Sequence, residues 1–340
     1  MASEPRIIFC DDDNLVVRRA FRELRHRGVY RWIRGELVNR YLTRRRLDRA
    51  SIQSSLRIMD IELTNYCNHK CKFCLTGLSA NARPKGKMDL DTFKNTVRDV
   101  SPGTVLVFAG FGEPFLNENL EEFVEHAGTL GLAEDIEILS NFGAVSEERI
   151  RKLLDHRFKR LVISLDSMSR ETFMEYRGCD DFDRVFNNIK ILSDEVKQRK
   201  NIQQELIVQM VISKKNVAES QSFIETIRNL HLIPRLKQLN THNSFADEQK
   251  INEFEVPEYS RYGNRGYSRR CEWVWGGMIV LWNGDVSICC QDAAGREVYG
   301  NVNRQDAIKL LNTAGGRCQF RRKYFHNPGE IELCRRCDVA

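Results

Sequence analysis

Apolar residues follow two alternating patterns from Leu56 onward. Short runs rich in β-branched and aromatic residues are typical of buried strands, and we expect strands at 56–63, 104–109, 135–140, 160–165, 205–212 and 232–239. Between them, helical spacing is clearest in Leu120-Phe123-Val124-Ala127-Leu130 and Val217-Phe223-Ile227-Leu230. This series of β-α units predicts a parallel sheet covered by helices. The pattern leaves open both a doubly wound sheet and an open arc related to the TIM barrel.

Residues 1–55 follow a different pattern, and we expect two short helices divided at Gly28. Thirteen arginines face seven acidic residues in this segment, so it carries the whole formal charge of +6. Such an extension can touch an acidic partner or a membrane surface, but more often its apolar stripe packs on the main domain. Charges balance in the remainder, which argues against a nucleic-acid substrate.

A chain of 340 residues exceeds the usual single-domain size. We therefore expect a helical N-terminal extension (1–55), a core domain (56–240), a linker (241–270) and a small C-terminal domain (271–340). No apolar run reaches the ~20 residues that span a bilayer, and no signal peptide is visible. In a chain of this size the 11 cysteines suit metal ligands in a reducing cytoplasm better than disulfides.

Three cysteines, Cys67, Cys71 and Cys74, follow the first expected strand at spacing C-x3-C-x2-C. Three thiolates can share one metal centre but leave one position open, and open sites carry out chemistry. The alternative is a structural zinc site completed by His69. An aromatic residue, Phe73, lies between the second and third cysteines.

Polar residues stand at the ends of four successive expected strands. Cys67 follows the first strand, Glu113 the second and Asn141 the third, while Ser164 and Asp166 end the fourth. The carboxyl ends of parallel strands meet at one edge of the sheet, where α/β proteins place their sites. The sequence therefore predicts a polar cavity at that edge.

The last quarter of the chain holds a second cysteine set. Cys271 and Cys289 flank Asn283-Gly284, a pair typical of a type I′ hairpin turn, and Cys334 and Cys337 follow much later. Four thiolates saturate one centre, either zinc or an iron–sulfur cluster. Cys290 would point away from Cys289 on a strand, so we do not expect it to be a ligand.

The first cysteine set, with Phe73 and the later Gly112-Glu113-Pro114 turn, resembles the radical S-adenosylmethionine (radical SAM) enzymes. The resemblance implies a partial (β/α)6 barrel in which Cys67, Cys71 and Cys74 hold a four-iron, four-sulfur cluster. S-adenosylmethionine would bind the fourth iron and yield a 5′-deoxyadenosyl radical that abstracts hydrogen. The cofactor would also contact a set of residues matching the family's motifs: Phe73, Gly112, Glu113, Asn141, Ser164, Asp166 and Arg177. Phe111 and Ser167 stand where the family commonly has glycine.

The second cysteine set is similar to the auxiliary-cluster domain called SPASM or, in its shortened form, twitch. This likeness implies one auxiliary four-iron, four-sulfur cluster on Cys271, Cys289, Cys334 and Cys337. The pattern is most similar to twitch-type dehydrogenases of aminocyclitol antibiotic biosynthesis, which oxidise a secondary alcohol to a ketone. It implies an oxidoreductase acting on a small sugar-, aminocyclitol- or nucleoside-like substrate, with a flavodoxin or ferredoxin as electron donor.

Other functions stay open. A SPASM enzyme can crosslink or epimerise a ribosomal peptide, and related radical enzymes are epimerases or decarboxylases. Epimerisation needs a thiol hydrogen donor, for which Cys179 and Cys318 are candidates, Cys179 being placed nearer the expected cavity. A non-catalytic electron carrier or a zinc-stabilised scaffold would leave the open three-cysteine site unexplained.

Overall fold

The computed structural model describes residues 8–10, 56–72, 74, 83–199, 201–239, 254, 256, 271–312, 316–335 and 337. Ten strands form one sheet: β1 (Ile8–Cys10), β2 (Ile58–Ile61), β3 (Val105–Phe108), β4 (Ile136–Ser140), β5 (Arg160–Ser164), β6 (Glu205–Val211), β7 (Ile233–Lys237), β8 (Gly277–Val280), β9 (Asp285–Ser287) and β10 (Val298–Asn301). The six predicted strands are confirmed as β2 to β7.

Helices connect these strands. The α-helices are α4 (Leu90–Val97), α5 (Leu120–Thr129), α6 (Glu147–Leu154), α7 (Arg170–Arg177), α8 (Phe182–Gln198), α9 (Ser220–Asn229), α11 (Glu272–Gly276), α12 (Ala307–Asn312), α13 (Gly316–His326) and α14 (Glu332–Arg335). Short 3₁₀ helices are η1 (Pro114–Leu116), η2 (Ala133–Asp135), η3 (Val217–Glu219) and η6 (Pro328–Glu330). No helix within these described ranges is long and apolar enough to cross a membrane.

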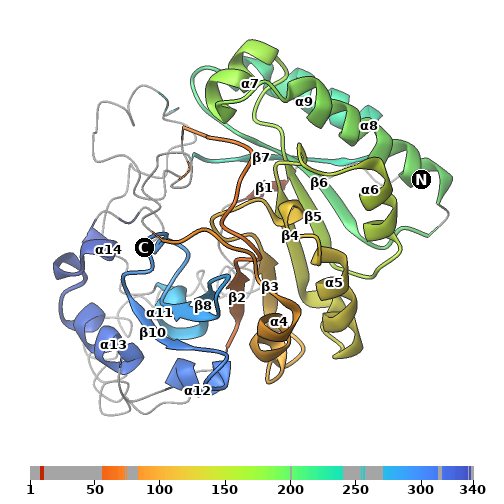
Figure 1. Cartoon of the computed structure of the whole chain (residues 1–340). Coiled ribbons are helices and arrows are strands. Elements are labelled where there is room, and N and C mark those ends of the chain that lie inside the picture. The colour runs from red at the N-terminus through yellow and green to blue at the C-terminus, as the bar shows by residue number, and fades with distance from the viewer. Residues whose placement is uncertain are drawn as a thin grey trace, which may run out of the picture.

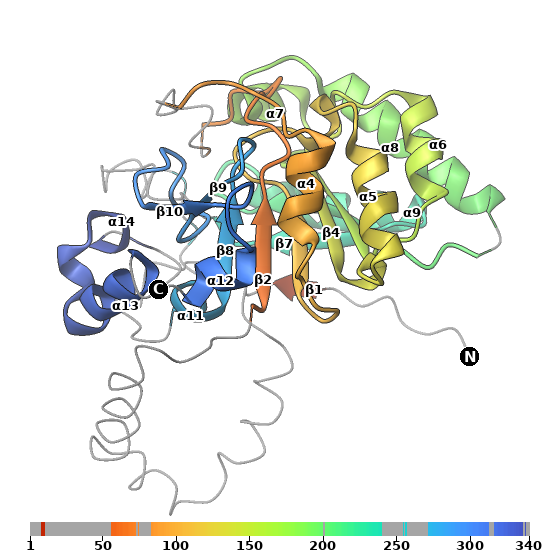
Figure 2. The same cartoon turned by 60° about the horizontal axis from the view of Figure 1, so that its bottom comes forward.

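Strand order decides between the two predicted architectures. The sheet runs β1-β7-β6-β5-β4-β3-β2-β8-β9-β10, and β2 to β7 are parallel neighbours in chain order. A doubly wound sheet reverses its order part-way, whereas a steady order with right-handed crossovers keeps the helices on one face. Figures 1 and 2 show α4 to α9 along the outside of a curved sheet. The fold is therefore the open (β/α)6 arc.

The main core lies between this outer layer of helices and the sheet. Strand residues on the outer face alternate with residues on the concave inner face, so that Met59 and Ile61 of β2 join the core while Asp60 does not. Helix starts are fixed by side-chain caps, such as Asp89, whose carboxylate accepts the Thr92 N–H at 2.7 Å. The inner face is thus left for polar side chains.

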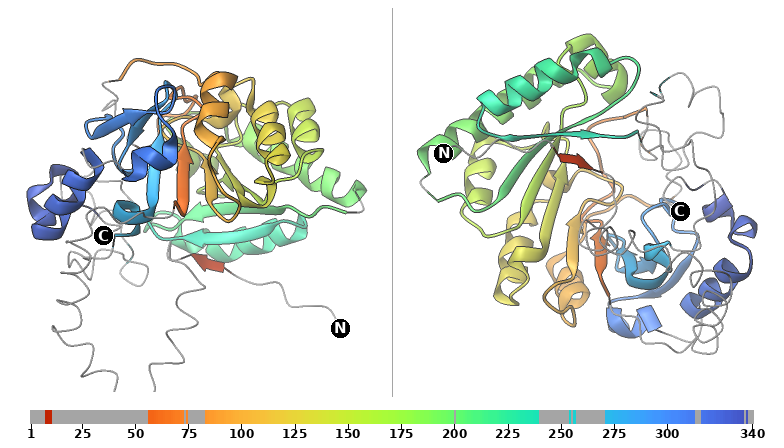
Figure 3. Two further views of the ribbon diagram at one scale, coloured as in Figure 1. Left: turned by 90° about the horizontal axis from the view of Figure 1, so that it is seen from below. Right: turned by 180° about the vertical axis from the view of Figure 1, so that it is seen from behind.

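Two findings differ from the sequence-based expectation. First, Ile8–Cys10 form strand β1, parallel to β7, in a segment expected to be helical; the predicted helices of residues 1–55 lie outside the described residues. Figure 3 shows β1 beside β7. Second, β8 pairs in parallel with β2, with Asp60 opposite Ile279. The C-terminal segment therefore continues the core sheet, and its helices α11 to α14 lie at the β8–β10 end of that sheet (Figure 1).

The β8–β9 turn also corrects a prediction. A type I′ turn needs a positive φ at both central residues, but among the described residues only Phe142 and His231 show one outside glycine. Gly284 has φ +85°, its N–H donates to Leu281 O at 2.8 Å, and Leu281 N–H donates to Asp285 O at 2.8 Å. The loop therefore has three residues, with glycine in the left-handed position.

Candidate functional site

The loop with Cys67, Cys71 and Cys74 starts directly beyond β2 and is held by backbone contacts to the end of α7. Lys70 N–H donates to Arg177 O and Lys72 N–H to Tyr176 O, both at 2.9 Å. Gly178 follows with φ +63°, and a Cβ there would lie 2.6 Å from Lys70 O. The loop is therefore positioned by the Arg-Gly element itself.

Two side chains donate to thiols of this loop. Asn141 Nδ2 lies 3.7 Å from Cys67 Sγ, and Arg177 Nη1 lies 3.7 Å from Cys71 Sγ. The pKa of Cys67 is raised to about 12, mainly by burial, and Cys71 and Cys74 add to the rise. The three cysteines are therefore close enough to affect one another's ionisation. Three convergent thiols with neighbouring donors fit a cluster ligand set.

His69 does not complete a four-ligand set with these cysteines in the described structure. Its Nε2 lies 3.2 Å from Asp181 Oδ2, and its ring meets Phe173 edge-on at 6.0 Å. Burial lowers the pKa of His69 to about 4. The same Asp181 oxygen accepts from Asn68 Nδ2 at 3.2 Å. His69 and Asn68 thus fasten the cysteine loop to the start of α8.

The Glu113 carboxylate lies at the centre of the strand ends. Oε1 accepts from Ser140 Oγ at 2.7 Å and from Phe115 N–H at 3.2 Å, and Oε2 accepts from Asn141 N–H at 2.7 Å. Burial raises the pKa of Glu113, and these bonds work against the rise. A carboxylate offers about four acceptor positions, so one remains for a ligand cation such as an ammonium.

Glycine is required in the turn that carries Glu113. A Cβ on Gly112 would lie 2.0 Å from Thr64 O, and one on Gly110 (φ +67°) would lie 2.5 Å from Glu62 Cβ. Glu113 N–H also donates to Tyr66 O at 2.8 Å. The turn is therefore packed directly on the segment that leads into Cys67.

Asn141 is followed by backbone strain. Phe142 is non-glycine with φ +61°, and its carbonyl accepts from Asn188 Nδ2 at 2.8 Å. Non-glycine residues in the left-handed region cost free energy and persist where surrounding contacts hold them. The strained step directs Asn141 Nδ2 to Cys67 Sγ and to Asn68 Oδ1, 2.9 Å away.

Asp166 and Arg177 form a buried ion pair of 2.7 Å. Asp166 Oδ1 also accepts from Val211 N–H at 2.9 Å, which ties this pair to the end of β6. Burial opposes the charge of Arg177, but Asp166 and Cys71 raise its pKa overall. Ser164 ends β5 opposite Gln209 of β6, whose buried Oε1 has no hydrogen-bond partner among the described residues. Phe73 lies outside the described residues.

Cys179 is half-buried behind the cysteine loop. Its sulfur, one His69 ring nitrogen and one Asp181 oxygen lie within 4.8 Å of one another. Burial and Asp181 raise the pKa of Cys179 to about 11. Cys318 is buried in α13 of the C-terminal segment.

The four C-terminal cysteines form a second group. Cys271 precedes α11, Cys289 follows β9, and Cys334 and Cys337 lie in and just after α14. The pKa of Cys289 is raised well above its usual value by burial and then by Cys271, Cys337 and Cys334. Burial and two of these neighbours raise that of Cys334 to about 12. Four mutually interacting thiols fit a closed metal centre.

This second group is set in an apolar cluster of buried residues: Val274, Ile288, Phe320, Tyr324, Ile331 and Cys334. Two buried arginines that the sequence analysis missed support it from α13. Arg317 donates to Trp273 O at 2.5 Å and to Ile288 O at 3.2 Å, and Arg321 donates to Val274 O at 3.0 Å. They satisfy carbonyls at the end of α11, the helix that Cys271 begins.

Cys290 is not on a strand, contrary to the prediction, because β9 ends at Ser287. Burial raises its pKa well above the usual value, and Cys289 and Asp60 raise it further. The reasoning from strand alternation therefore does not apply to it. Cys290 is thus close enough to Cys289 and to Asp60 for their charges to act on its thiol.

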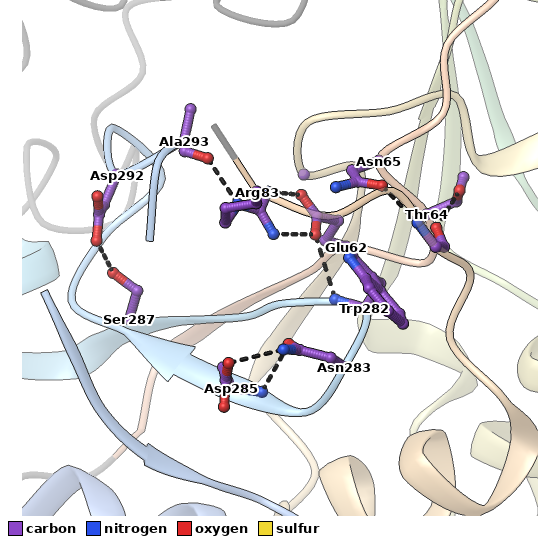
Figure 4. A network of polar contacts seen from close by, with 12 residues as sticks. Glu62, Thr64, Asn65, Arg83, Trp282, Asn283, Asp285, Ser287, Asp292 and Ala293 are labelled. Carbon is purple, nitrogen blue, oxygen red and sulfur yellow. Dashed lines mark hydrogen bonds and ion pairs between the residues drawn. The ribbon is translucent and has the colours of Figure 1, made fainter. Parts of the chain in front are cut away.

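A polar clamp joins the core to the C-terminal segment (Figure 4). Arg83 forks onto Glu62 with bonds of 2.9 and 2.6 Å, and its Nε donates to Ala293 O at 2.7 Å. Trp282 N–H also donates to Glu62, at 3.2 Å. Phe111 packs beside this clamp against Ile279, Leu281 and Ala293. The residue that departs from the family's glycine thus contacts the C-terminal segment.

Known families match both halves of this arrangement. The model of the radical SAM superfamily matches residues 61–209, and the model of an iron–sulfur cluster-binding domain, SPASM, matches residues 271–338. Residues 61–209 thus form a radical SAM domain, and residues 271–338 form a SPASM domain. These two domains imply S-adenosylmethionine, a four-iron, four-sulfur cluster that binds it, and an auxiliary iron–sulfur cluster as cofactors.

Curated relatives match part of this radical SAM chain. A probable GTP 3′,8-cyclase of Saccharolobus solfataricus is 32% identical over 178 residues, 52% of this chain and 54% of that protein. An uncharacterized protein of Methanocaldococcus jannaschii is 33% identical over 134 residues, 39% of this chain and 42% of that protein. The chain thus spans about half the length of the curated relatives it matches.

Solved structures share the fold over more of the chain. BtrN in complex with AdoMet and 2-DOIA is 16% identical with a TM-score of 0.54, covering 84% of this chain and 94% of BtrN. Streptococcus suis SuiB bound to the precursor peptide SuiA is 15% identical with a TM-score of 0.61, covering 81% of this chain and 69% of SuiB. At these identities the likeness concerns the radical SAM fold alone.

Proposed function

We propose that this radical SAM enzyme is a dehydrogenase that oxidises a secondary alcohol of a small hydroxylated molecule to a ketone. The observation that carries the proposal is the set of four thiols, Cys271, Cys289, Cys334 and Cys337, in a C-terminal segment whose strands continue the core sheet. A centre with four protein ligands has no position for substrate. It suits accepting an electron, which dehydrogenation requires after hydrogen abstraction.

Each site residue has a role in this proposal. Cys67, Cys71 and Cys74 hold the cluster that binds S-adenosylmethionine, and Glu113 receives the methionine ammonium at its remaining acceptor position. Asn141, Ser164 and Asp166 line the cofactor's polar groups at the strand ends. Arg177 is already paired with Asp166, so we assign it to holding Asp166 and donating to Cys71 as well as to the cofactor carboxylate.

The clusters and S-adenosylmethionine, when bound, supply the 5′-deoxyadenosyl radical and the acceptor for the second electron. The chain's own residues orient the reactants and exclude water. Glu113 and the Gly110–Pro114 turn fix the cofactor against the cysteine loop, since the turn packs on Thr64 and Tyr66. The Arg83–Glu62 clamp keeps the C-terminal segment against the inner face of β2.

The comparison with BtrN supports a compact enzyme for a small substrate. This chain covers 94% of BtrN, whose complex contains AdoMet and 2-DOIA, but only 69% of the peptide-bound SuiB. The matched region therefore includes a larger share of BtrN than of SuiB. We infer a twitch-type C-terminal domain with one auxiliary cluster, a role in natural-product biosynthesis, and a flavodoxin or ferredoxin as the reductant.

The test is anaerobic reconstitution followed by a screen of aminocyclitols, sugars and nucleosides with a reducing system. We expect 5′-deoxyadenosine and a product lighter than its substrate by two hydrogen atoms. Serine at both Cys334 and Cys337 should abolish that product but leave some cleavage of S-adenosylmethionine. A matched control is Cys179→Ser, which we expect to retain product. Product formation that survives without the auxiliary centre would contradict the electron-acceptor role.

A second candidate is cyclisation of a nucleotide, favoured by the similarity to probable GTP 3′,8-cyclases. GTP therefore belongs in the screen. Conversion of GTP into an isomer of unchanged formula would support this reading against oxidation. A precursor peptide gives the third arm, because SuiB binds one.

A further inference from the structure

Asp60 is a buried carboxylate on the inner face of β2 that the site described above does not use. Its neighbours Met59 and Ile61 point into the helix-covered core, so Asp60 faces the concave side of the sheet. It lies one residue before the end of β2, and 8% of its surface is exposed. A carboxylate in this position needs a partner or a function.

Asp60 has one engaged oxygen. Oδ1 accepts from Gly110 N–H at 3.0 Å, whereas within the part of the chain that the structure describes Oδ2 has no hydrogen-bond partner. Glu62, two residues along the same face, differs. Both of its oxygens are bonded to Arg83, and Oε1 also accepts from Trp282 N–H (Figure 4). Of these two carboxylates, and as far as the described residues go, Asp60 alone keeps an oxygen to bind something else.

The surroundings place Asp60 between the two candidate cofactor sites. Gly110, to which it is bonded, begins the turn that carries Glu113. On the other side of β2 lies β8, with Ile279 opposite Asp60, and the charge of Asp60 raises the pKa of the Cys290 thiol, next to the auxiliary candidate ligand Cys289. Burial raises the pKa of Asp60 to about 7, and Glu62 adds to the rise, while the Gly110 bond lowers it. The titratable groups acting on it are Glu62, which is paired with Arg83, and Cys290.

We propose that Asp60 is the catalytic base that takes the hydroxyl proton from the substrate radical. This inference rests on the proposed dehydrogenase function and adds the residue that completes it. Hydrogen transfer to the 5′-deoxyadenosyl radical leaves a carbon radical bearing a hydroxyl group. The O–H bond of this radical would then break and its proton would go to Asp60 Oδ2. Its electron would pass to the oxidised auxiliary cluster that Cys271, Cys289, Cys334 and Cys337 would hold, and the C=O bond would form. Charge and atoms balance, and the proton later returns to water.

The position suits this role. A general base works best when its pKa lies near the working pH and when it reaches the proton that it removes. Asp60 lies between the turn that would hold the radical source and the centre that would take the electron. A substrate carbon that loses hydrogen to the radical on one side and an electron to the auxiliary centre on the other would therefore have this carboxylate beside it.

The principal test is Asp60→Asn, which keeps an oxygen to accept the Gly110 N–H. With substrate deuterated at the oxidised carbon, we expect deuterium to enter 5′-deoxyadenosine at close to the wild-type rate. Ketone formation should fall by about 10²- to 10⁴-fold, the usual contribution of a general base. Asp60→Glu should restore part of it. The exposed Asp91→Asn in α4 is the matched control and should behave as wild type.

A second readout does not depend on turnover. Difference infrared spectra of the reconstituted chain should show a protonated-carboxyl band that titrates near pH 7 and is missing in Asp60→Asn. Wild-type ketone formation should rise with pH through the same range.

Distinct outcomes separate the base from the proposed function. Ketone formation within a few-fold of wild type in Asp60→Asn overturns the base. Loss of deuterium transfer together with ketone also overturns it, since Asp60 would then serve cofactor or substrate binding. A wild-type product of unchanged formula would instead overturn the dehydrogenase, and the base with it.

Discussion

The two cysteine groups of this chain are built in opposite ways. The first is a polar loop, in which Asn141 and Arg177 donate to sulfurs and all three cysteines are only partly buried. The second adjoins a cluster of apolar side chains, with Cys334 buried and its other three cysteines partly buried. Hydrogen bonds and positive charge favour the reduced, more negative form of a cluster, whereas an apolar shell disfavours it. The contrast separates an open group of three cysteines, which leaves a position for a further ligand, from a closed group of four.

The largest expected effect comes from removing either group. Alanine at Cys67, Cys71 and Cys74 together should abolish cleavage of S-adenosylmethionine and leave about four of about eight irons. Alanine at Cys334 and Cys337 should remove a similar share of iron but preserve uncoupled cleavage. Iron content and 5′-deoxyadenosine yield measure both. Zinc in place of iron at the second group after anaerobic reconstitution would contradict an auxiliary iron–sulfur cluster there, because that centre would be structural.

The packing around the second cysteine group can be disrupted by a substitution in α13. Arg317→Leu removes the donors to carbonyls around α11 and should lower the free energy of unfolding by about 3–5 kcal/mol, since buried acceptors lose their partners. Iron at the second group should be lost and iron at the first retained. Thermal unfolding and iron content are the measurements. Arg322→Leu, an exposed position on the same helix, should change neither.

The carboxylate between the groups gives a pH-dependent effect. The pKa of Asp60 is raised from 3.8 to about 7, so between these pH values the folded chain keeps a proton that the unfolded chain loses. Wild-type stability should therefore fall as pH rises through this window. Asp60→Asn removes the cost of ionising this buried carboxyl. The resulting increase in the free energy of unfolding should be absent below pH ~4 and reach at most roughly 4 kcal/mol above pH ~7. Chemical denaturation across this range checks it; a gain equal at all pH values would be against the prediction.

The smallest expected effect concerns the polar loop. Arg177→Met removes a positive donor from Cys71 Sγ and should lower the first cluster's reduction potential by about 60 mV, a tenfold change in a one-electron equilibrium. Arg177→Lys should lower the reduction potential by less, because lysine keeps the positive charge. A redox titration followed by electron paramagnetic resonance measures this. Arg184→Met, an equal charge change on exposed α8, serves as control, and an equal shift there would assign the effect to net charge.

Much of the fold was predictable because it depends on local pattern. The runs at 56–63 and 205–212 are apolar over strand length, and both became parallel strands. Parallel pairing of β8 with β2 was not predictable, since Gly277–Val280 has the same appearance in an isolated hairpin. The turn type was missed because Asn-Gly suits more than one hairpin loop.

The site was predictable where it rests on motif spacing and not where it rests on long-range contacts. Glu113 and Asn141 stand at strand ends in the sequence, and the structure joins them by one hydrogen bond. Arg317 lies in a run of charged residues that suggests a surface helix, yet it is fully buried. The position of Asp60 could have been predicted from the sequence. Asp60 and Glu62 alternate with apolar residues in and just after β2, and such alternation indicates a strand with one polar face.

The position of β2 has a consequence for synthesis on the ribosome. β2 is hydrogen-bonded to β3 on one side and to β8 on the other, and β8 lies more than two hundred residues further along the chain. Until Val280 has been translated, one edge of β2 stays an unpaired strand, open to pairing with other nascent chains. The sheet is completed only when the C-terminal segment supplies β8, β9 and β10. A chain terminated before β8 is therefore a candidate for aggregation rather than a functional half-enzyme, and chaperones would matter most during this interval.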